Sequence, residues 1–265
     1  MKIVIFKELT HKVIAIAKEA GAFISDQRKT FTPDKIEFKG LNDLVSYVDK
    51  TAEEKIVAAL KNIIPGAGFL TEEKTINETG ERYNWIIDPL DGTTNFIHGL
   101  PVYSVSIALQ EFDELVLGVV YEINQDECFY AWKGSPAYLN GHEIKVSNTP
   151  TIDKSLIGTG FPYYDFGKQS AYMELFRELM RSCHGLRRLG SAAVDLVYTA
   201  CGRFDAFYEY NLNPWDVAAG IVIVRQAGGE VVNFKGGDES LKTRELLATN
   251  GKITEEMLNV IQKYF

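Results

Sequence analysis

The sequence predicts a fold of the α/β or α+β class in which helices pack in layers on mixed sheets. Three strand patterns follow one another at 102–110, 115–123 and 127–133. The short polar turns E-F-D-E and N-Q-D join them, so an antiparallel meander is expected. Downstream of these strands, apolar patterns of the strand type and of the helix type alternate, which is typical of sheets covered by helices.

The first half of the chain is expected to contribute two helices before the meander. Apolar residues such as Val13, Ala17 and Ile24 recur at helical spacing in the first helix, and Pro65 and Gly66 end the second. The elements expected in order are a helix at 9–29, a polar hairpin or loop at 35–48, a helix at 51–64, a strand at 68–71 and a polar loop at 76–82.

The second half is expected to begin after an L-N-G turn at 139–141, with a crossing at about 147–151. Its predicted strands lie at 156–159, 184–188, 205–208, 230–233 and 246–249. Its predicted helices lie at 169–181, 192–201, 214–227 and 254–263. No internal repeat or flexible linker separates the halves, so we expect one domain over 1–265 with two intimate halves, 1–148 and 149–265.

The composition is that of an ordinary globular protein, with 265 residues of which 46% are hydrophobic and 24% charged. The formal net charge of -8 argues against general nucleic-acid binding or binding to an anionic membrane, because phosphate backbones are bound by clustered Lys and Arg. An acidic protein that handles a phosphate ester therefore needs bound cations to neutralise its site.

The cysteine content and the N-terminus indicate a cytoplasmic protein. Cys128, Cys183 and Cys201 are odd in number and lack metal-ligand spacing, so a disulfide framework is not expected and a reducing compartment is. The N-terminal apolar run I-V-I-F is too short for a signal peptide or a membrane span.

The stretch W-I-I-D-P-L-D-G-T-T-N-F-I-H-G, residues 85–99, is the strongest local signal in the chain. An apolar strand runs into Asp88, after which proline and glycine turn the chain. Asp88 and Asp91, with the carbonyl of Leu90 between them, can aim three oxygens at one point. Hard divalent cations such as Mg²⁺ prefer this kind of oxygen ligand.

Three small residues, Gly92, Thr93 and Thr94, follow where a helix should start. Unpaired N–H groups at a helix start suit an anion such as phosphate, so a cation site and an anion site would be neighbours. The letters D-P-x-D-G also suit an ordinary turn, which remains the alternative. The Thr-Thr pair and the preceding apolar run favour the site over the plain turn.

A second acidic position lies at the start of a predicted helix. Asn213 suits the N-cap and Pro214 the first helical position, so Asp216 falls in the first turn. The helix dipole favours an acid there whether or not it binds a ligand. The A-A-G sequence that follows should let this helix pack closely.

These two stretches together resemble the inositol monophosphatase family. W-I-I-D-P-L-D-G-T-T-N-F is similar to its first signature, and W-D-V-A-A-G at 215–220 is similar to its second, W-D-x-A-A-G. The resemblance covers nearly the whole chain. It implies a layered αβαβα sandwich and a magnesium-dependent, lithium-sensitive phosphomonoesterase, commonly a homodimer.

The resemblance also implies which residues hold the metal and perform the chemistry. The implied ligands of two or three Mg²⁺ ions are Glu72, Asp88, the carbonyl of Leu90, Asp91 and Asp216. The implied catalytic residues are Glu72 and the pair Thr93 and Asp49, which would orient or deprotonate the attacking water. Adjacent surface glutamates are usually only a charged face, and this alternative stays open for Glu73.

The substrate contacts implied by the resemblance surround the same site. They are Asp91, Gly92, Thr93, Thr94, Gly190, Ser191, Ala192, Glu209 and Asp216. Ser191 equally suits a helix N-cap. Glu209 resembles the acid that accepts hydrogen bonds from inositol hydroxyls, which favours a polyol. Lys39 resembles a lysine of a lid, although Leu41 and Asn42 beside it depart from the family's pattern.

The leading functional hypothesis is hydrolysis of myo-inositol monophosphate, or of a close polyol or sugar phosphate, by metal-activated water. The alternative substrates for the same metal chemistry are fructose 1,6-bisphosphate, 3'-phosphoadenosine 5'-phosphate and histidinol phosphate. A further alternative is a regulatory binding protein of transcription or ribosome assembly. Fold and metal site alone cannot separate these hypotheses.

Overall fold

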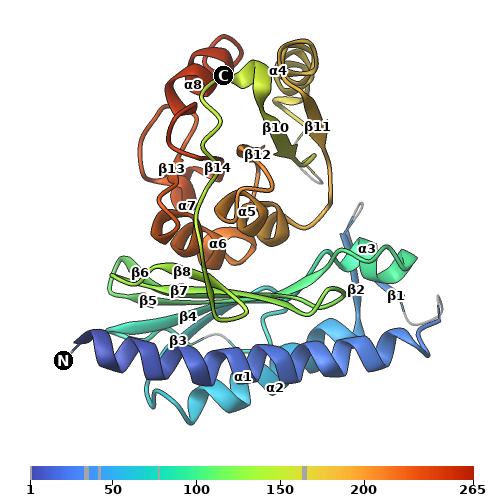
Figure 1. Ribbon diagram of the computed structural model, residues 1–265. Helices are drawn as coiled ribbons and strands as arrows, with labels where there is room; N and C mark the ends of the chain where they lie inside the picture. The colour runs from blue at the N-terminus through green and yellow to red at the C-terminus, as the bar shows by residue number, and fades with distance from the viewer. Residues whose placement is uncertain (1, 33–35, 41–42, 77, 163–165) are drawn as a thin grey trace.

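Helices and sheets alternate in five layers in the structure, a computed structural model (Figure 1). It describes residues 2–32, 36–40, 43–76, 78–162 and 166–265, with the backbone alone for 2–5, 36–40 and 43–45. The helical layers are α1 (Lys2–Arg28) with α2 (Tyr47–Lys61), then α5 (Ala192–Ala200) with α6 (Pro214–Gln226), then α4 (Gln169–Ser182) with α8 (Thr254–Ile261). The predicted layered αβαβα sandwich is confirmed.

A seven-stranded sheet separates the first two helical layers, in the order β3-β4-β5-β6-β7-β8-β9. Its strands are β3 (Gly68–Thr71), β4 (Tyr83–Asp91), β5 (Ser104–Glu111), β6 (Glu114–Glu122), β7 (Glu127–Trp132), β8 (Ala137–Leu139) and β9 (His142–Ile144). Only β3 and β4 pair in parallel, and β5 to β7 form the predicted antiparallel meander. The β8–β9 hairpin was not predicted, because its strands are only three residues long.

A five-stranded mixed sheet forms the fourth layer, in the order β11-β10-β12-β14-β13. Its strands are β10 (Leu156–Thr159), β11 (Gly185–Arg187), β12 (Ala206–Tyr210), β13 (Glu230–Val232) and β14 (Glu245–Thr249). Strand β10 pairs in parallel with β11 and β12, whereas β14 is antiparallel to β12 and β13. Every strand and helix predicted for the second half is present, β10 with the predicted bounds and the others with shifted ends, and η2 (Ile152–Lys154) and α7 (Ser240–Thr243) are additional.

Alternate side chains of β12 pack against the helical layers on the two faces of its sheet. Ala206, Tyr208 and Tyr210 belong to the apolar cluster under α4 and α8. Phe207 belongs to the cluster around α5 and α6, because successive side chains of a strand point to opposite faces. Glu209 has the same parity as Phe207 and therefore faces the middle helices, where a pocket lies.

Helix α6 is buried on all sides between the two sheets. Its residues from Val217 to Val224 are all buried, as expected of a helix in the middle of a sandwich. A Cβ added at Gly220 would lie 2.5 Å from Leu196 Cδ1 on α5, and one at Gly118 would lie 2.4 Å from the Ala219 carbonyl. The close packing expected of the A-A-G sequence is confirmed, and it fixes the start of α6 between the layers.

Two local predictions near the site need correction. Helix α2 begins at Tyr47 rather than at residue 51, because Ser46 is its N-cap and forms a capping box with Asp49. Asp49 therefore lies inside the first helical turn. Strand β4 continues through Pro89 to Asp91 instead of ending at Asp88, although its register against β5 shifts between Asp88 and Asp91.

The remaining short elements flank the site. The predicted polar hairpin is a two-stranded antiparallel one, β1 (Ile36–Gly40) with β2 (Asp43–Ser46), and α3 (Thr93–His98) follows β4. The side chain of Lys39 and all of Leu41 and Asn42 lie outside what the structure describes, so the lid stays a prediction. None of the helices, over the residues described, has the length and apolar character to cross a membrane.

Candidate active site

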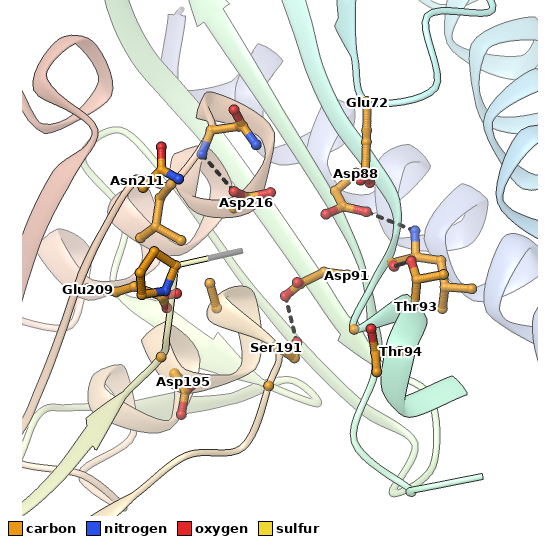
Figure 2. A pocket seen from close by; sticks show the side chains of 18 of the residues that line it. Glu72, Asp88, Asp91, Thr93, Thr94, Ser191, Asp195, Glu209, Asn211 and Asp216 are labelled. Atoms are coloured by element: carbon orange, nitrogen blue, oxygen red, sulfur yellow. Dashed lines mark hydrogen bonds between the residues drawn. The ribbon is translucent and has the colours of Figure 1, made fainter. Parts of the chain in front are cut away.

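The predicted site residues come together around one pocket, with a cavity of about 110 Å³ (Figure 2). The predicted residues that line it are Glu72, Asp88, Leu90, Asp91, Gly92, Thr93, Thr94, Gly190, Ser191, Ala192, Glu209 and Asp216. They come from β3–β4, the start of α3, the start of α5, the end of β12 and the start of α6. Asp49 does not line the cavity but contacts it through Thr93.

Three of the acids are each held through one carboxyl oxygen. Asp88 Oδ1 accepts the Leu90 N–H at 2.9 Å, and Asp216 Oδ2 accepts the Asn213 N–H at 2.6 Å. Asp91 Oδ2 accepts the Ser191 hydroxyl at 2.5 Å. These bonds orient the carboxyl groups, which Figure 2 shows directed toward the same open space.

Burial and mutual repulsion raise the free energy of these groups in their ionised form unless a positive charge lies nearby. Burial raises the pKa of Asp88 well above its usual range, and the charges of Glu72, Asp91 and Asp216 add to the effect. Burial likewise raises the pKa of Asp91 to about 6 and that of Asp216 to about 7. A cation among these groups would relieve the repulsion.

The donor set fits a hard divalent cation, since the acids and the Leu90 carbonyl offer only oxygen. Within the described part of the chain, no three acidic, histidine or cysteine side chains are already grouped so as to hold a metal ion. The acids nevertheless line one pocket together with Leu90.

The predicted pairing of Thr93 with Asp49 is present in space. The Thr93 hydroxyl lies 2.9 Å from Asp49 Oδ1 and 3.0 Å from the Leu90 carbonyl, and it can donate to one of them at a time. Asp49 Oδ2 accepts the N–H of Ser46 at 2.9 Å and its hydroxyl at 2.7 Å. Burial raises the pKa of Asp49 despite these bonds. Helix capping thus aims Asp49 at the threonine.

Gly92 turns the chain from β4 into α3. Its φ of +96° is in the left-handed region that favours glycine, and a Cβ there would lie 3.0 Å from the Val102 carbonyl. The turn places Thr93 and Thr94 on the pocket wall. Asn95 in the next position donates to the carbonyls of Val102 and Leu189, at 2.7 and 2.9 Å, and so attaches the segment before α5 to α3.

The start of α5 contacts the acids directly. Besides the Ser191 hydroxyl, Asp91 Oδ2 accepts the Ala193 N–H at 2.7 Å, so Asp91 interacts with the positive end of the helix dipole. Ser191 also caps α5, because its Oγ accepts the Val194 N–H. One carboxylate therefore joins the acid cluster to the segment that carries Gly190 and Ala192.

Several residues of the site were not identified from the sequence. The further residues that line the cavity are Asp195, Arg188, Gly160, Pro162, Asn211, Leu212 and Asn213. Asp195 lies four positions after Ser191 in a helix, so it shares the face of Ser191, and this spacing is the signal that could have found it. No comparable spacing points to the others, because their place depends on how distant segments pack.

Glu53 was also missed, and it supports the loop that carries Glu72. It is fully buried on α2, and its carboxylate accepts the N–H groups of Glu73 and Thr75, both at 2.8 Å. The Thr75 hydroxyl donates to the same carboxylate at 2.7 Å. An acid in an interior helical position thus fixes the backbone immediately after Glu72.

The αβαβα sandwich and the acid-lined pocket against its middle helices agree with the class of protein that the two signatures resemble. The chain belongs to the inositol monophosphatase family, whose model matches residues 6–264. The family is generally metal-dependent. The resemblance drawn from the two signatures is confirmed.

The relatives carry two kinds of name. The chain is 37% identical over 256 residues to the inositol-1-monophosphatase of Mesorhizobium japonicum, covering 96% of each. It is 40% identical over 253 residues to the Nus factor SuhB of Pseudomonas aeruginosa, covering 94% of this chain and 93% of that protein. The solved structure of the extragenic suppressor protein suhB of Bartonella henselae matches with a TM-score of 0.91 at 36% identity, covering 97% of this chain and 100% of that one.

Proposed function

We propose that this protein is a Mg²⁺-dependent phosphomonoesterase that hydrolyses myo-inositol monophosphate or a closely related polyol phosphate. The observation that supports the proposal is the meeting of Glu72, Asp88, Asp91 and Asp216 around one small cavity. The Thr93 and Asp49 pair lies on its edge. A phosphate monoester bound by so acidic a pocket requires bound cations.

The proposed cation ligands are Glu72, Asp88, the Leu90 carbonyl, Asp91 and Asp216, for two or three Mg²⁺ ions. When bound, the ions would polarise the phosphate and lower the pKa of water at the site. Asp49 accepts a hydrogen bond from Thr93, and this pair together with Glu72 would orient the attacking water and accept its proton.

The proposed substrate contacts divide between the two sides of the cavity. The start of α3, at Gly92, Thr93 and Thr94, would receive the phosphate. Gly190, Ser191, Ala192 and Glu209 on the opposite side would receive the alcohol. Burial raises the pKa of Glu209 well above its usual range, which suits a group that hydrogen-bonds substrate hydroxyls.

The test is phosphate release from a panel of esters in Mg²⁺ and in chelator. The panel contains inositol 1-phosphate, fructose 1,6-bisphosphate, 3'-phosphoadenosine 5'-phosphate and histidinol phosphate. We expect Mg²⁺-dependent release with the highest kcat/KM for inositol 1-phosphate and inhibition by lithium. A higher kcat/KM for one of the other three would replace the substrate, and no release from any would overturn the enzyme assignment.

A second candidate function is binding to the transcription machinery, because a relative that is 40% identical is named a Nus factor. This role can coexist with catalysis. The test is co-purification of transcription factors with the parent protein and with Asp88→Asn, which should lack catalysis. Capture by both variants would support the role, and capture by neither would count against it.

The expected assembly and location belong to the same proposal. We propose a cytoplasmic homodimer of one domain with intimate halves at 1–148 and 149–265. Sedimentation of the purified protein tests the dimer, and limited proteolysis around residue 148 tests the intimacy of the halves. Release of a stable half would contradict the single domain.

A further inference from the structure

Asp195 is a buried acid in the pocket for which the proposed chemistry has no use. The residue is 1% exposed, and its Oδ1 has no hydrogen-bond partner among the described residues. It nevertheless lines the cavity. A buried carboxyl oxygen without a hydrogen-bond partner destabilises a fold, so its place beside a binding pocket suggests a ligand that supplies the missing hydrogen bond.

The structure makes room for Asp195 and Glu209 with two glycines at the end of β10. A Cβ at Gly158 would lie 3.2 Å from Asp195 Oδ1, and a Cβ at Gly160 would lie 2.0 Å from Glu209 Oε2. The two glycines are two positions apart and so share a face of the extended chain. Two carboxyl groups from different elements therefore occupy space that side chains would otherwise fill.

The charges on this side of the pocket are also unbalanced. Four of the acids that line it are assigned to cations in the proposed function, which leaves Asp195 and Glu209. Burial raises the pKa of Asp195 and of Glu209 well above their usual ranges. The charge of Arg188, the single basic residue among the described residues that line the cavity, acts in the opposite direction on both acids. Carboxyl oxygens accept hydrogen bonds from hydroxyls, and a carboxyl group in its ionised form repels a phosphate.

We propose that Asp195 is a specificity-determining residue that, together with Glu209, binds adjacent hydroxyl groups of a neutral polyol and excludes substrates carrying a second phosphate. The inference rests on the proposed phosphomonoesterase activity and deepens it. It predicts that the Asp195 carboxyl group contributes to the discrimination between polyol monophosphates and polyol bisphosphates. Figure 2 shows the two acids on the side of the pocket away from Glu72 and Asp88.

The test compares inositol 1-phosphate with inositol 1,4-bisphosphate in the parent protein and in Asp195→Asn, which keeps the shape and removes the charge. We expect the KM for inositol 1-phosphate to rise about tenfold or more while kcat changes by less than about threefold, as for loss of a hydrogen bond to a charged group. The ratio of kcat/KM between the two esters should fall about tenfold. An unchanged ratio would overturn the proposal.

A matched control separates specificity from folding. Glu122 is fully buried at the end of β6, and its carboxylate accepts hydrogen bonds from Asn124 and the Gln125 N–H, away from the pocket. Glu122→Gln should lower the melting temperature and leave the kcat/KM ratio unchanged. Asp195→Asn should change the kcat/KM ratio without lowering the melting temperature, because Oδ1 of Asp195 has no hydrogen-bond partner to lose among the described residues. A large loss of melting temperature in Asp195→Asn with an unchanged ratio would show a merely structural acid.

The outcomes distinguish this inference from the proposed function. If the parent protein hydrolyses neither ester in Mg²⁺, the proposed function fails and the inference fails with it. If the parent is active and Asp195→Asn leaves the ratio unchanged, only the inference fails. Should Asp195→Asn not fold, Asp195→Ser offers a smaller neutral side chain for the same comparison.

Discussion

Replacing Asp88 by asparagine tests the cation site most directly. Asp88 is 2% exposed, and its burial, together with repulsion from the carboxylates around it, raises its pKa. Asparagine removes this repulsion, and its amide oxygen can still accept the Leu90 N–H, a bond of 2.9 Å in the parent. We therefore expect Asp88→Asn in chelator to melt no lower than the parent.

The Mg²⁺ response should differ sharply between the two proteins. At about 100 times its dissociation constant, Mg²⁺ should stabilise the parent by about 2.7 kcal/mol, or raise its melting temperature by about 5–10 °C. Asp88→Asn should lose most of this shift and at least about 10–100-fold in kcat/KM. Thermal melts with and without Mg²⁺ measure the shift in melting temperature, and phosphate-release assays measure kcat/KM. Asp113→Asn, at an exposed position, is the control. Retention of the shift and of full activity would refute a role for Asp88 in cation binding.

Three further predictions follow from single contacts. Thr93→Val removes the hydroxyl that lies 2.9 Å from Asp49, so phosphate-release assays should show kcat lowered about 10²–10⁴-fold, with recovery in Thr93→Ser. Glu53→Gln places an amide next to the N–H groups of Glu73 and Thr75, and Mg²⁺ titration of activity should show a half-maximal concentration raised about 10–100-fold; an unchanged value would contradict the support of Glu72 by this residue. Gly220→Ala places a Cβ 2.5 Å from Leu196, which should cost about 1–3 kcal/mol in denaturant unfolding; a neutral result would mean that α5 and α6 can separate freely.

The layers were predictable because each long element carries its own pattern. The meander and the buried helix at 214–227 have apolar runs that match their depth in the sandwich. The errors lie at the ends of helices and strands, because hydrogen bonds rather than the apolar pattern determine where an element begins. Ser46 and Asp49 bond to each other and start α2 four residues early, which the S-Y-V-D sequence signals only as a capping box.

The candidate site was predictable as a set of residues but not as a geometry. Spacing within 85–99 suggested that Asp88 and Asp91 act together, and the structure places both on one cavity. The bonds from Thr93 to Asp49 and from Ser191 to Asp91 join segments far apart in the chain, and only packing can create them. Asp195 escaped notice because an acid on a helix usually faces solvent. Which residues bind metal and substrate remains a prediction.

The hydrogen bonds of Asp91 have a consequence for how the pocket can be redesigned. The same oxygen that anchors this acid accepts the first donors of α5, from Ser191 and Ala193. Any attempt to reshape the pocket by moving α5 would therefore also displace Asp91. Substitutions that change the shape of the pocket should be tolerated more readily at Pro162, which lines the cavity from outside α5.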